Sequence, residues 1–295
     1  MSTRLGVIYR PTFHPDGLRG VATAAEAAGV DELWFWEDCF QQGGIAQVAV
    51  ALAATERVRV GVGLIPAPLR NVAAAAMEFA TLDAMFPGRV RIAVGHGVQS
   101  WMRQAGAAVA SPMTLLREYV TALQALLAGQ TVSVTGRYVN LDAVRLEFPP
   151  EHRLPVLIGG TGPKTLRLAG EIADGVVVDS RYSTRTVHAA LEHVAAGRTD
   201  ADADADADAR PFSTVLFLAC APGEDSASTL AAEAERQEVA ADDVFGVGGS
   251  AAQISAGLGA YRDAGVDTIA LQPLGALADM GRFIAAAADV VGLAD

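Results

Sequence analysis

The chain has 295 residues, of which 51% are hydrophobic and 19% charged, and its formal net charge is −12. These values fit one large barrel or two small domains, and the negative charge argues against a nucleic-acid partner, because an acidic chain repels the phosphate backbone. Cys39 and Cys220 form no CxxC pair, so no structural disulfide is indicated and a cytoplasmic location is expected. The N-terminal residues lack a signal-peptide core, and no apolar run is long enough to span a membrane.

Taken in chain order, short apolar runs alternate with longer segments of helical periodicity, which is the pattern of buried parallel strands separated by helices. Gly29 is a predicted helix stop, and Ser250 with Gln253 forms a predicted capping box. The expected strands are residues 4–8, 32–36, 59–64, 90–94, 155–158, 175–179, 213–219 and 268–272. The expected helices are residues 16–28, 45–55, 72–85, 111–128, 184–196, 226–239, 250–264 and 280–291, with one more beginning at residue 163.

Eight strands, most of them followed by a helix, predict an α/β fold of the (β/α)8 TIM-barrel type, and an open doubly wound sheet is the alternative. No stretch resembles an interdomain linker, so residues 1–295 are predicted to form a single domain. Residues 131–148 are expected to contain a small hairpin outside the barrel, and residues 98–110 are expected to be irregular. The Asp-Ala repeat within 199–210 is predicted to be a solvated acidic loop, because its like charges repel.

Residues 155–179 predict a strand, a glycine turn, a helix and a second strand. The turn offers unpaired backbone N–H groups at the positive end of a helix dipole, with little side-chain bulk to keep an anion away. It therefore predicts a phosphate-binding cup, and the alternative is a tight turn without a ligand. A Walker A loop is excluded because proline precedes Lys164, and no GxGxxG fingerprint is present. The residues of the predicted cup are Gly159, Gly160, Thr161, Gly162 and Pro163.

In a barrel the carboxyl ends of the strands carry the active site. Two candidate catalytic residues follow such ends: Asp38 after the second predicted strand, and His96 after the fourth. Asp38 is expected to transfer a proton or position a ligand, and the alternative is a helix cap. His96 is expected to contact a ligand or donate a proton, and the alternative is a loop histidine with protein partners. The sequence shows no HExxH motif and no cluster of metal-ligating residues, so a metal site is not indicated.

Four segments resemble the bacterial luciferase-like superfamily, in the right order along nearly the whole chain. They are AAGVDELWFWEDCF at 27–40, GVGLIPAPLRNVAAAAMEFATLDAMFPGRVRIAVGHG at 61–97, IGGTGPKTLRLAGEIADGVVV at 158–178 and YRDAGVDTIALQPLG at 261–275. Within the superfamily the chain is most similar to the branch dependent on the deazaflavin F420, which includes methylenetetrahydromethanopterin reductases.

The resemblance implies a barrel whose mouth holds F420, which exchanges a hydride at C5 of its ring with a small organic substrate. FMN is the alternative cofactor. The resemblance places the tail phosphate at the glycine cup and the ring near Asp38, Gly95 and His96. It also implies a non-prolyl cis peptide between Gly63 and Leu64, behind the ring.

Two positions depart from the pattern of F420-dependent relatives. Cys39 stands where those relatives commonly have a histidine beside the aspartate, and Val98 stands where an alcohol-oxidising relative has a glutamate. The alcohol-oxidising mechanism is therefore not carried over. Three functions stay open: an F420-dependent oxidoreductase, an FMN-dependent monooxygenase that works with a separate reductase, and a flavin-binding protein without catalysis. Family habit implies a homodimer, and the substrate is not readable.

Overall fold

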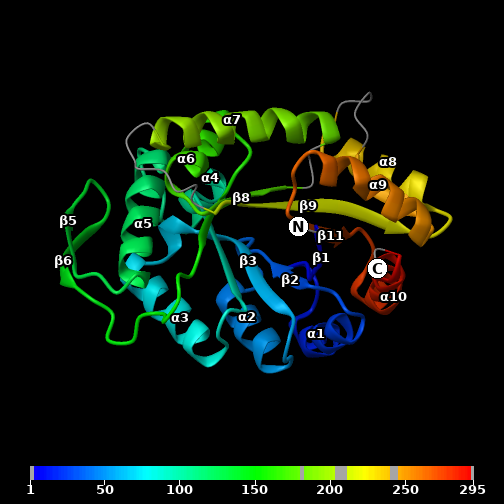
Figure 1. The fold of residues 1–295 in the computed structure, drawn as a ribbon, viewed down its shortest axis with the longest axis horizontal. Helices are drawn as coiled ribbons and strands as arrows, with labels where there is room; N and C mark the ends of the chain where they lie inside the picture. Colours follow the sequence, from blue (N-terminus) through cyan, green and yellow to red (C-terminus); the bar gives the residue numbers. More distant parts are fainter. Residues whose placement is uncertain (1–2, 180–182, 203–210, 240–244, 294–295) are drawn as a thin grey trace.

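We describe the protein from a computed structural model, which places residues 3–179, 183–202, 211–239 and 245–293. Eight parallel strands pair side by side, and the pairing of β8 with β9 closes them into a barrel. Figure 1 shows helices arranged around these strands. The predicted (β/α)8 fold is confirmed. The barrel strands are β1 (Arg4–Ile8), β2 (Glu32–Phe35), β3 (Arg59–Pro66), β4 (Val90–Gly95), β7 (Val156–Gly159), β8 (Gly175–Val178), β9 (Ser213–Pro222) and β11 (Thr268–Pro273).

Helices follow the strands and cover the outside of the barrel, as the sequence periodicity predicts. Three short 3-10 helices precede or link them, at Pro15–Gly17, Ala67–Leu69 and Leu277–Asp279. The α-helices are α1 (Leu18–Ala27), α2 (Gly44–Ala53), α3 (Val72–Met85), α4 (Gln99–Gln104), α5 (Pro112–Leu127), α6 (Pro163–Ile172), α7 (Thr184–Asp202), α8 (Ser226–Arg236), α9 (Ala251–Asp263) and α10 (Met280–Gly292). None of these helices is long and apolar enough to cross a membrane within the placed residues.

Two predicted helix boundaries are confirmed, together with the local interactions that were expected to fix them. Gly29 ends the first helical segment with a φ of 75°, a conformation that favours glycine. Ser250 and Gln253 form the expected capping box at the start of α9. The expected hairpin is present as β5 (Val132–Thr135) and β6 (Asn140–Val144), and it projects beside α5 at the left of Figure 1.

Two expectations were wrong, and one strand was not predicted. The segment expected to be irregular contains α4, which begins after Val98. α7 continues to Asp202, so residues 199–202 are helical rather than loop, and the remaining acidic residues 203–210 lie outside the described chain. A short extra strand, β10 (Val247–Gly249), pairs with the end of β9 outside the barrel. Its Gly-rich sequence carries too weak a β propensity to be predicted.

The barrel interior is filled around the indole of Trp34, which is fully buried. The neighbouring strand β3 has glycines at 61 and 63, and a Cβ added to Gly61 would lie 2.5 Å from Trp34 Cε3. The indole N–H donates a 2.9 Å hydrogen bond to Glu32 Oε2, and the other carboxylate oxygen of Glu32 lies 3.1 Å from an Arg59 nitrogen. The carboxylate of Glu32 thus holds the indole N–H, and the absence of a side chain at Gly61 leaves room for the ring.

This packing predicts that Gly61→Ala destabilises the barrel, because the new methyl group meets a ring that has no room to move. Overpacking of this kind costs about 1–3 kcal/mol. The control is Gly20→Ala on the exposed face of α1, where an added Cβ meets nothing within 4 Å. That change should stabilise the protein by about 0.5–1 kcal/mol, because alanine is the better helix former. Urea midpoints of the two variants and the wild type measure both effects, and equal midpoints for both variants would contradict the packing.

Candidate active site

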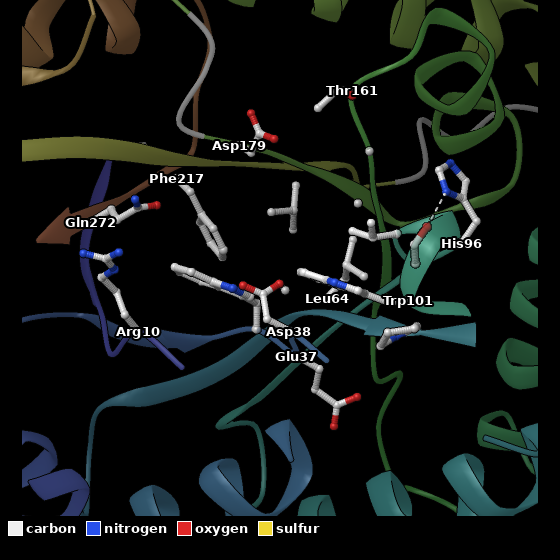
Figure 2. Close-up of a pocket in the computed structure, with 18 of the residues that line it drawn as sticks. Arg10, Glu37, Asp38, Leu64, His96, Trp101, Thr161, Asp179, Phe217 and Gln272 are labelled. Carbon is white, nitrogen blue, oxygen red and sulfur yellow. Dashed lines mark hydrogen bonds between the residues drawn. The ribbon is translucent and has the colours of Figure 1, made fainter. Parts of the chain in front are cut away.

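A cavity of about 580 Å³ opens at the carboxyl ends of the barrel strands (Figure 2). Most of its lining residues come from the ends of β1, β2, β3, β4, β7, β8, β9 and β11 and from the loops that follow. This is the end of a barrel at which active sites lie. The hairpin β5/β6 contributes nothing to the lining, whereas Val98 and Trp101 do.

The central part of the cavity is apolar. Phe217 on β9 packs edge-on against Trp34 with ring centroids 5.5 Å apart, and Trp36 lies 6.1 Å from the same Phe217 ring. Leu64 and Trp101 complete this surface in the middle of Figure 2. Flat, apolar walls of this kind suit a planar ring system, which gains burial without needing hydrogen bonds on its faces.

Leu64 projects into the cavity from an irregularity in β3. The register between β3 and β4 shifts between Gly63 and Ile65, and the Gly63–Leu64 peptide is cis, as the resemblance implied. The Leu64 side chain packs so closely on two neighbouring strands that a Cβ at Gly95 would lie 2.5 Å from its Cδ2, and one at Gly159 would lie 2.6 Å from it. Gly95 is therefore required beneath Leu64 and does not itself line the cavity. A second cis peptide, Cys39–Phe40, was not expected.

Asp38 points into the middle of the cavity (Figure 2). Burial raises the pKa of its carboxyl group, while a hydrogen bond from Trp36 and the positive charge of Arg10 act in the opposite direction. The neutral acid therefore persists to a higher pH than in an exposed aspartate. A carboxyl group in this state can donate a proton to a bound molecule as well as accept one.

Glu37, the neighbour of Asp38, has a structural role. Arg70 donates two hydrogen bonds to its carboxylate, at 2.7 and 2.8 Å, and the Gly44 N–H at the start of α2 donates a third at 2.7 Å. The paired fork holds the β2–α2 loop against the β3–α3 loop. Glu37 thereby fixes the backbone from which Asp38 projects.

The predicted glycine cup lies at the rim of the cavity. Gly159, Gly160 and Thr161 line the cavity, while Gly162 and Pro163 are exposed just beyond it. α6 begins at Pro163 as predicted, with Gly162 as its N-cap. The backbone N–H groups of Gly162 and Lys164 have no acceptor among the described residues. The cup therefore presents free donors at the positive end of a ten-residue helix, as an anion site requires.

His96 lines the cavity but faces away from Asp38. Its Nε2 lies 3.2 Å from Thr165 Oγ1, and its Nδ1 lies 3.5 Å from the Gly97 carbonyl oxygen. Figure 2 shows its ring at the edge of the cavity, with Asp38 nearer the centre. Both ring nitrogens thus have protein partners, and the ring links the β4–α4 loop to α6.

The structure brings Asp38, Gly63, Leu64, His96, Gly159, Gly160 and Thr161 together around one cavity. The sequence analysis missed Trp36, Val177 and Phe217, which lie in or directly after apolar strands where nothing distinguishes an inward residue from an outward one. It also missed Arg236 and Gln237 at the end of α8, which reach the cavity from outside the barrel. In the placed parts of the chain, no group of three or more histidine, cysteine, aspartate or glutamate side chains could hold a metal ion.

The chain matches the model of one known protein family over most of its length. The model of the luciferase-like monooxygenase family matches residues 2–241. The chain belongs to this family. The resemblance seen in the sequence is confirmed, and the cavity of this luciferase-like chain lies within the matched region apart from Gln272.

Two relatives of this luciferase-like chain are named for a tetrahydromethanopterin substrate and for F420. A 5,10-methylenetetrahydromethanopterin reductase of Methanolobus tindarius is 27% identical over 176 residues, which cover 60% of this chain and 53% of that protein. An F420-dependent glucose-6-phosphate dehydrogenase of Beutenbergia cavernae is 33% identical over 203 residues, covering 62% of this chain and 60% of that protein. The matched segment thus spans little more than half the length of either relative.

Solved structures agree on the luciferase-like fold. An F420-dependent secondary alcohol dehydrogenase in complex with an F420–acetone adduct superposes with a TM-score of 0.85 at 20% identity, over all of both chains. The oxygenating constituent of 3,6-diketocamphane monooxygenase from Pseudomonas putida, in complex with FMN, gives 0.77 at 15% identity, over 98% of this chain and 97% of that one. At these identities the likeness establishes the barrel.

The environment of Asp38 predicts how Asp38→Asn changes stability with pH. In the unfolded chain the carboxyl group titrates near its ordinary value of about 3.9, whereas in the fold its pKa is raised. Ionised Asp38 therefore destabilises the fold above its raised pKa, and this cost disappears below the unfolded value, where the group is neutral in both states. Asp38→Asn should raise the melting temperature at pH 7, and the gain should vanish near pH 4. Thermal denaturation between pH 4 and 8 measures this, and a lower melting temperature for the variant at pH 7 would contradict it.

Proposed function

We propose that this protein is an F420-dependent oxidoreductase that exchanges a hydride between C5 of the deazaflavin and a small organic substrate. The observation that carries the proposal is the combination, in one cavity, of an apolar slot, a half-buried carboxyl group and a glycine cup at a helix N-terminus. The name of the Beutenbergia cavernae relative, an F420-dependent glucose-6-phosphate dehydrogenase, points to the same cofactor.

The residues present fit the parts of F420. Leu64, Trp36 and Trp101 offer apolar surface for a planar ring, and the cavity volume of about 580 Å³ lies in the range of cofactor sites. The cup at Gly159–Gly162 is exposed on its outer side, so a phosphate held there can carry a long tail that continues into solvent. The free N–H groups of Gly162 and Lys164 would hold that phosphate.

Bound F420 supplies a hydride donor or acceptor at C5. The protein supplies position, exclusion of water and a proton. Asp38 is the group we assign to the proton, because its carboxyl projects into the slot and its pKa is raised by burial. We assign His96 a supporting role, since Thr165 and Gly97 engage its ring nitrogens. Cys39 is a poor proton carrier, because burial and the nearby Glu37 and Asp38 charges raise the pKa of its thiol.

The second candidate is an FMN-dependent monooxygenase supplied by a separate reductase. It is favoured by the family model and by the FMN-bound structural neighbour. Parallel titrations of the purified protein with F420 and with FMN test the two. We expect F420 to bind with a dissociation constant at least about tenfold lower than that of FMN, a difference of about 1.4 kcal/mol. Tight FMN binding without F420 binding would overturn the proposal in favour of the monooxygenase.

A matched pair of substitutions tests the tail site. Gly162 has φ −80° and ψ 145°, which proline can adopt, and an added Cβ meets nothing within 4 Å. Gly162→Pro removes one N–H donor, whereas Gly162→Ala keeps it. We expect the proline variant to bind F420 about tenfold more weakly and the alanine variant to bind like wild type, since a charged hydrogen bond contributes about 1.5–3 kcal/mol. Fluorescence titration measures this, and equal affinities in all three proteins would place the phosphate elsewhere.

We also propose that the protein is a homodimer joined through α2 and α3. The α2 sequence, GIAQVAVALA, has no charged residue, and its outer face exposes Val50 at 42%. On the neighbouring α3, Met77 is 62% and Met85 64% exposed. Helices that are apolar on all sides are normally buried, so this face matches the surface of a second copy of the chain.

Met77→Glu should convert the dimer to a monomer, because a dimer would bury the new charge without a partner. The control is Phe148→Glu, which is 78% exposed and belongs to the loop between β6 and β7 rather than to either helix. Light scattering after size exclusion at about 10 µM, well above the nM–µM dissociation constants of stable dimers, gives the mass of each variant. A monomeric wild type, or a dimeric Met77→Glu variant, would contradict the proposed interface.

A further inference from the structure

One end of the cavity carries a cation with unused hydrogen-bonding capacity. Arg10 follows β1 and lines the cavity on the side of Asp38 remote from His96 and Thr161 (Figure 2). Within the described residues, its one hydrogen bond runs from a terminal nitrogen to the Pro273 carbonyl oxygen, at 3.3 Å, and its guanidinium lies 5.8 Å from the Phe13 ring. Its Nε is buried without a partner. A guanidinium has five N–H donors, so most of them remain available.

No acidic side chain in the described chain forms an ion pair with Arg10. Glu233 and Asp38 are near enough to act on it through space, but neither comes within the 4.0 Å of a salt bridge. Glu233 is engaged by Arg236 at the end of α8, with a 2.8 Å hydrogen bond from the Arg236 Nε, and by Gln237 at 2.9 Å. A half-buried arginine without a carboxylate in direct contact is costly, which is the condition under which an anionic ligand gains most.

Gln272 completes this end of the cavity. Gln272 lies on the last barrel strand, β11, and is only 7% exposed. Its side-chain amide has no hydrogen-bond partner among the described residues. Arg10 bonds the carbonyl oxygen of the next residue, Pro273, and Figure 2 draws Gln272 and Arg10 on the same side of Asp38. A neutral amide next to a guanidinium adds an N–H donor without adding a second charge.

We propose that Arg10 and Gln272 bind the carboxylate of the substrate, and that the substrate is a small organic acid with an apolar body. This inference rests on the proposed function and deepens it by naming the substrate class. One planar guanidinium with a neighbouring amide matches the two oxygens of a carboxylate, which a fork of N–H donors binds bidentately. A phosphate dianion would find the second cation of this end, Arg236, already paired with Glu233, and the Asp38 carboxyl group nearby. The apolar body would then lie along Trp36 and Phe217, between the carboxylate and the cup.

The test uses a carboxylate and its neutral analogue as probes. Isothermal titrations with trans-cinnamate, trans-cinnamamide and glucose 6-phosphate are made on the wild type and on Arg10→Gln, with and without F420. The matched control is Arg103→Gln, which removes an exposed arginine of α4 outside the cavity lining. Gln272→Leu is the second variant, used if Arg10→Gln does not fold by circular dichroism.

We expect the wild type and Arg103→Gln to bind cinnamate at least about tenfold more tightly than cinnamamide, and Arg10→Gln to lose this preference while binding F420 within about twofold of wild type. Gln272→Leu should weaken cinnamate about threefold, as for one neutral hydrogen bond. Equal affinity of the wild type for acid and amide, preference for glucose 6-phosphate, or loss of F420 binding in Arg10→Gln would overturn the assignment. If the wild type binds FMN and not F420 but still prefers cinnamate, the proposed cofactor fails and the carboxylate site stands.

Discussion

The position of the cavity depends on how the indole of Trp34 fills the barrel. A barrel of eight strands has an interior just wide enough to be filled by side chains, and this one gives much of that space to a single large ring. Glu32 fixes the indole N–H from below, and the glycines at 61 and 63 leave room for the ring on β3. Above the indole the next layer consists of Phe217, Trp36 and Leu64, which form the floor and walls of the open cavity. The functional surface thus begins where the packing around Trp34 ends.

The glycines of the site divide into two kinds. No larger residue fits at Gly95 or Gly159, because the Leu64 side chain lies against both. These two glycines therefore belong to the packing that supports the cavity wall. Gly162 is in open space, and its exposed N–H is available to a ligand. A family resemblance marks all of them alike as cofactor-binding positions. The structure separates those that shape the wall from those that offer hydrogen bonds, and this separation determines which substitutions would report on ligand binding.

The fold was largely predictable from the sequence, because each barrel strand is a short apolar run bounded by a helix with a recognisable start or stop. Gly29 and the Ser250 capping box fixed such boundaries locally. The positions of Asp38 and the glycine cup were predictable because a barrel brings strand ends to one mouth. What could not be predicted is side-chain direction. The ring of His96 faces Thr165 on α6, a contact 69 residues away in sequence, and the inward orientation of Phe217 is hidden in a run where every residue is apolar. The unpaired donors of Arg10 follow equally from long-range packing, since its one backbone partner is Pro273 on the last strand.

We propose that one cavity, floored by the layer above Trp34, holds a planar redox ring with its anionic tail at the start of α6. The most direct measurement is a crystal structure of the protein with F420 bound. We expect tail-phosphate density within hydrogen-bonding distance of the Gly162 and Lys164 N–H groups, and the ring between Leu64 and Trp101 with its reactive edge toward Asp38. A tail phosphate bound anywhere else, or a ring whose reactive edge faces away from Asp38, would contradict it.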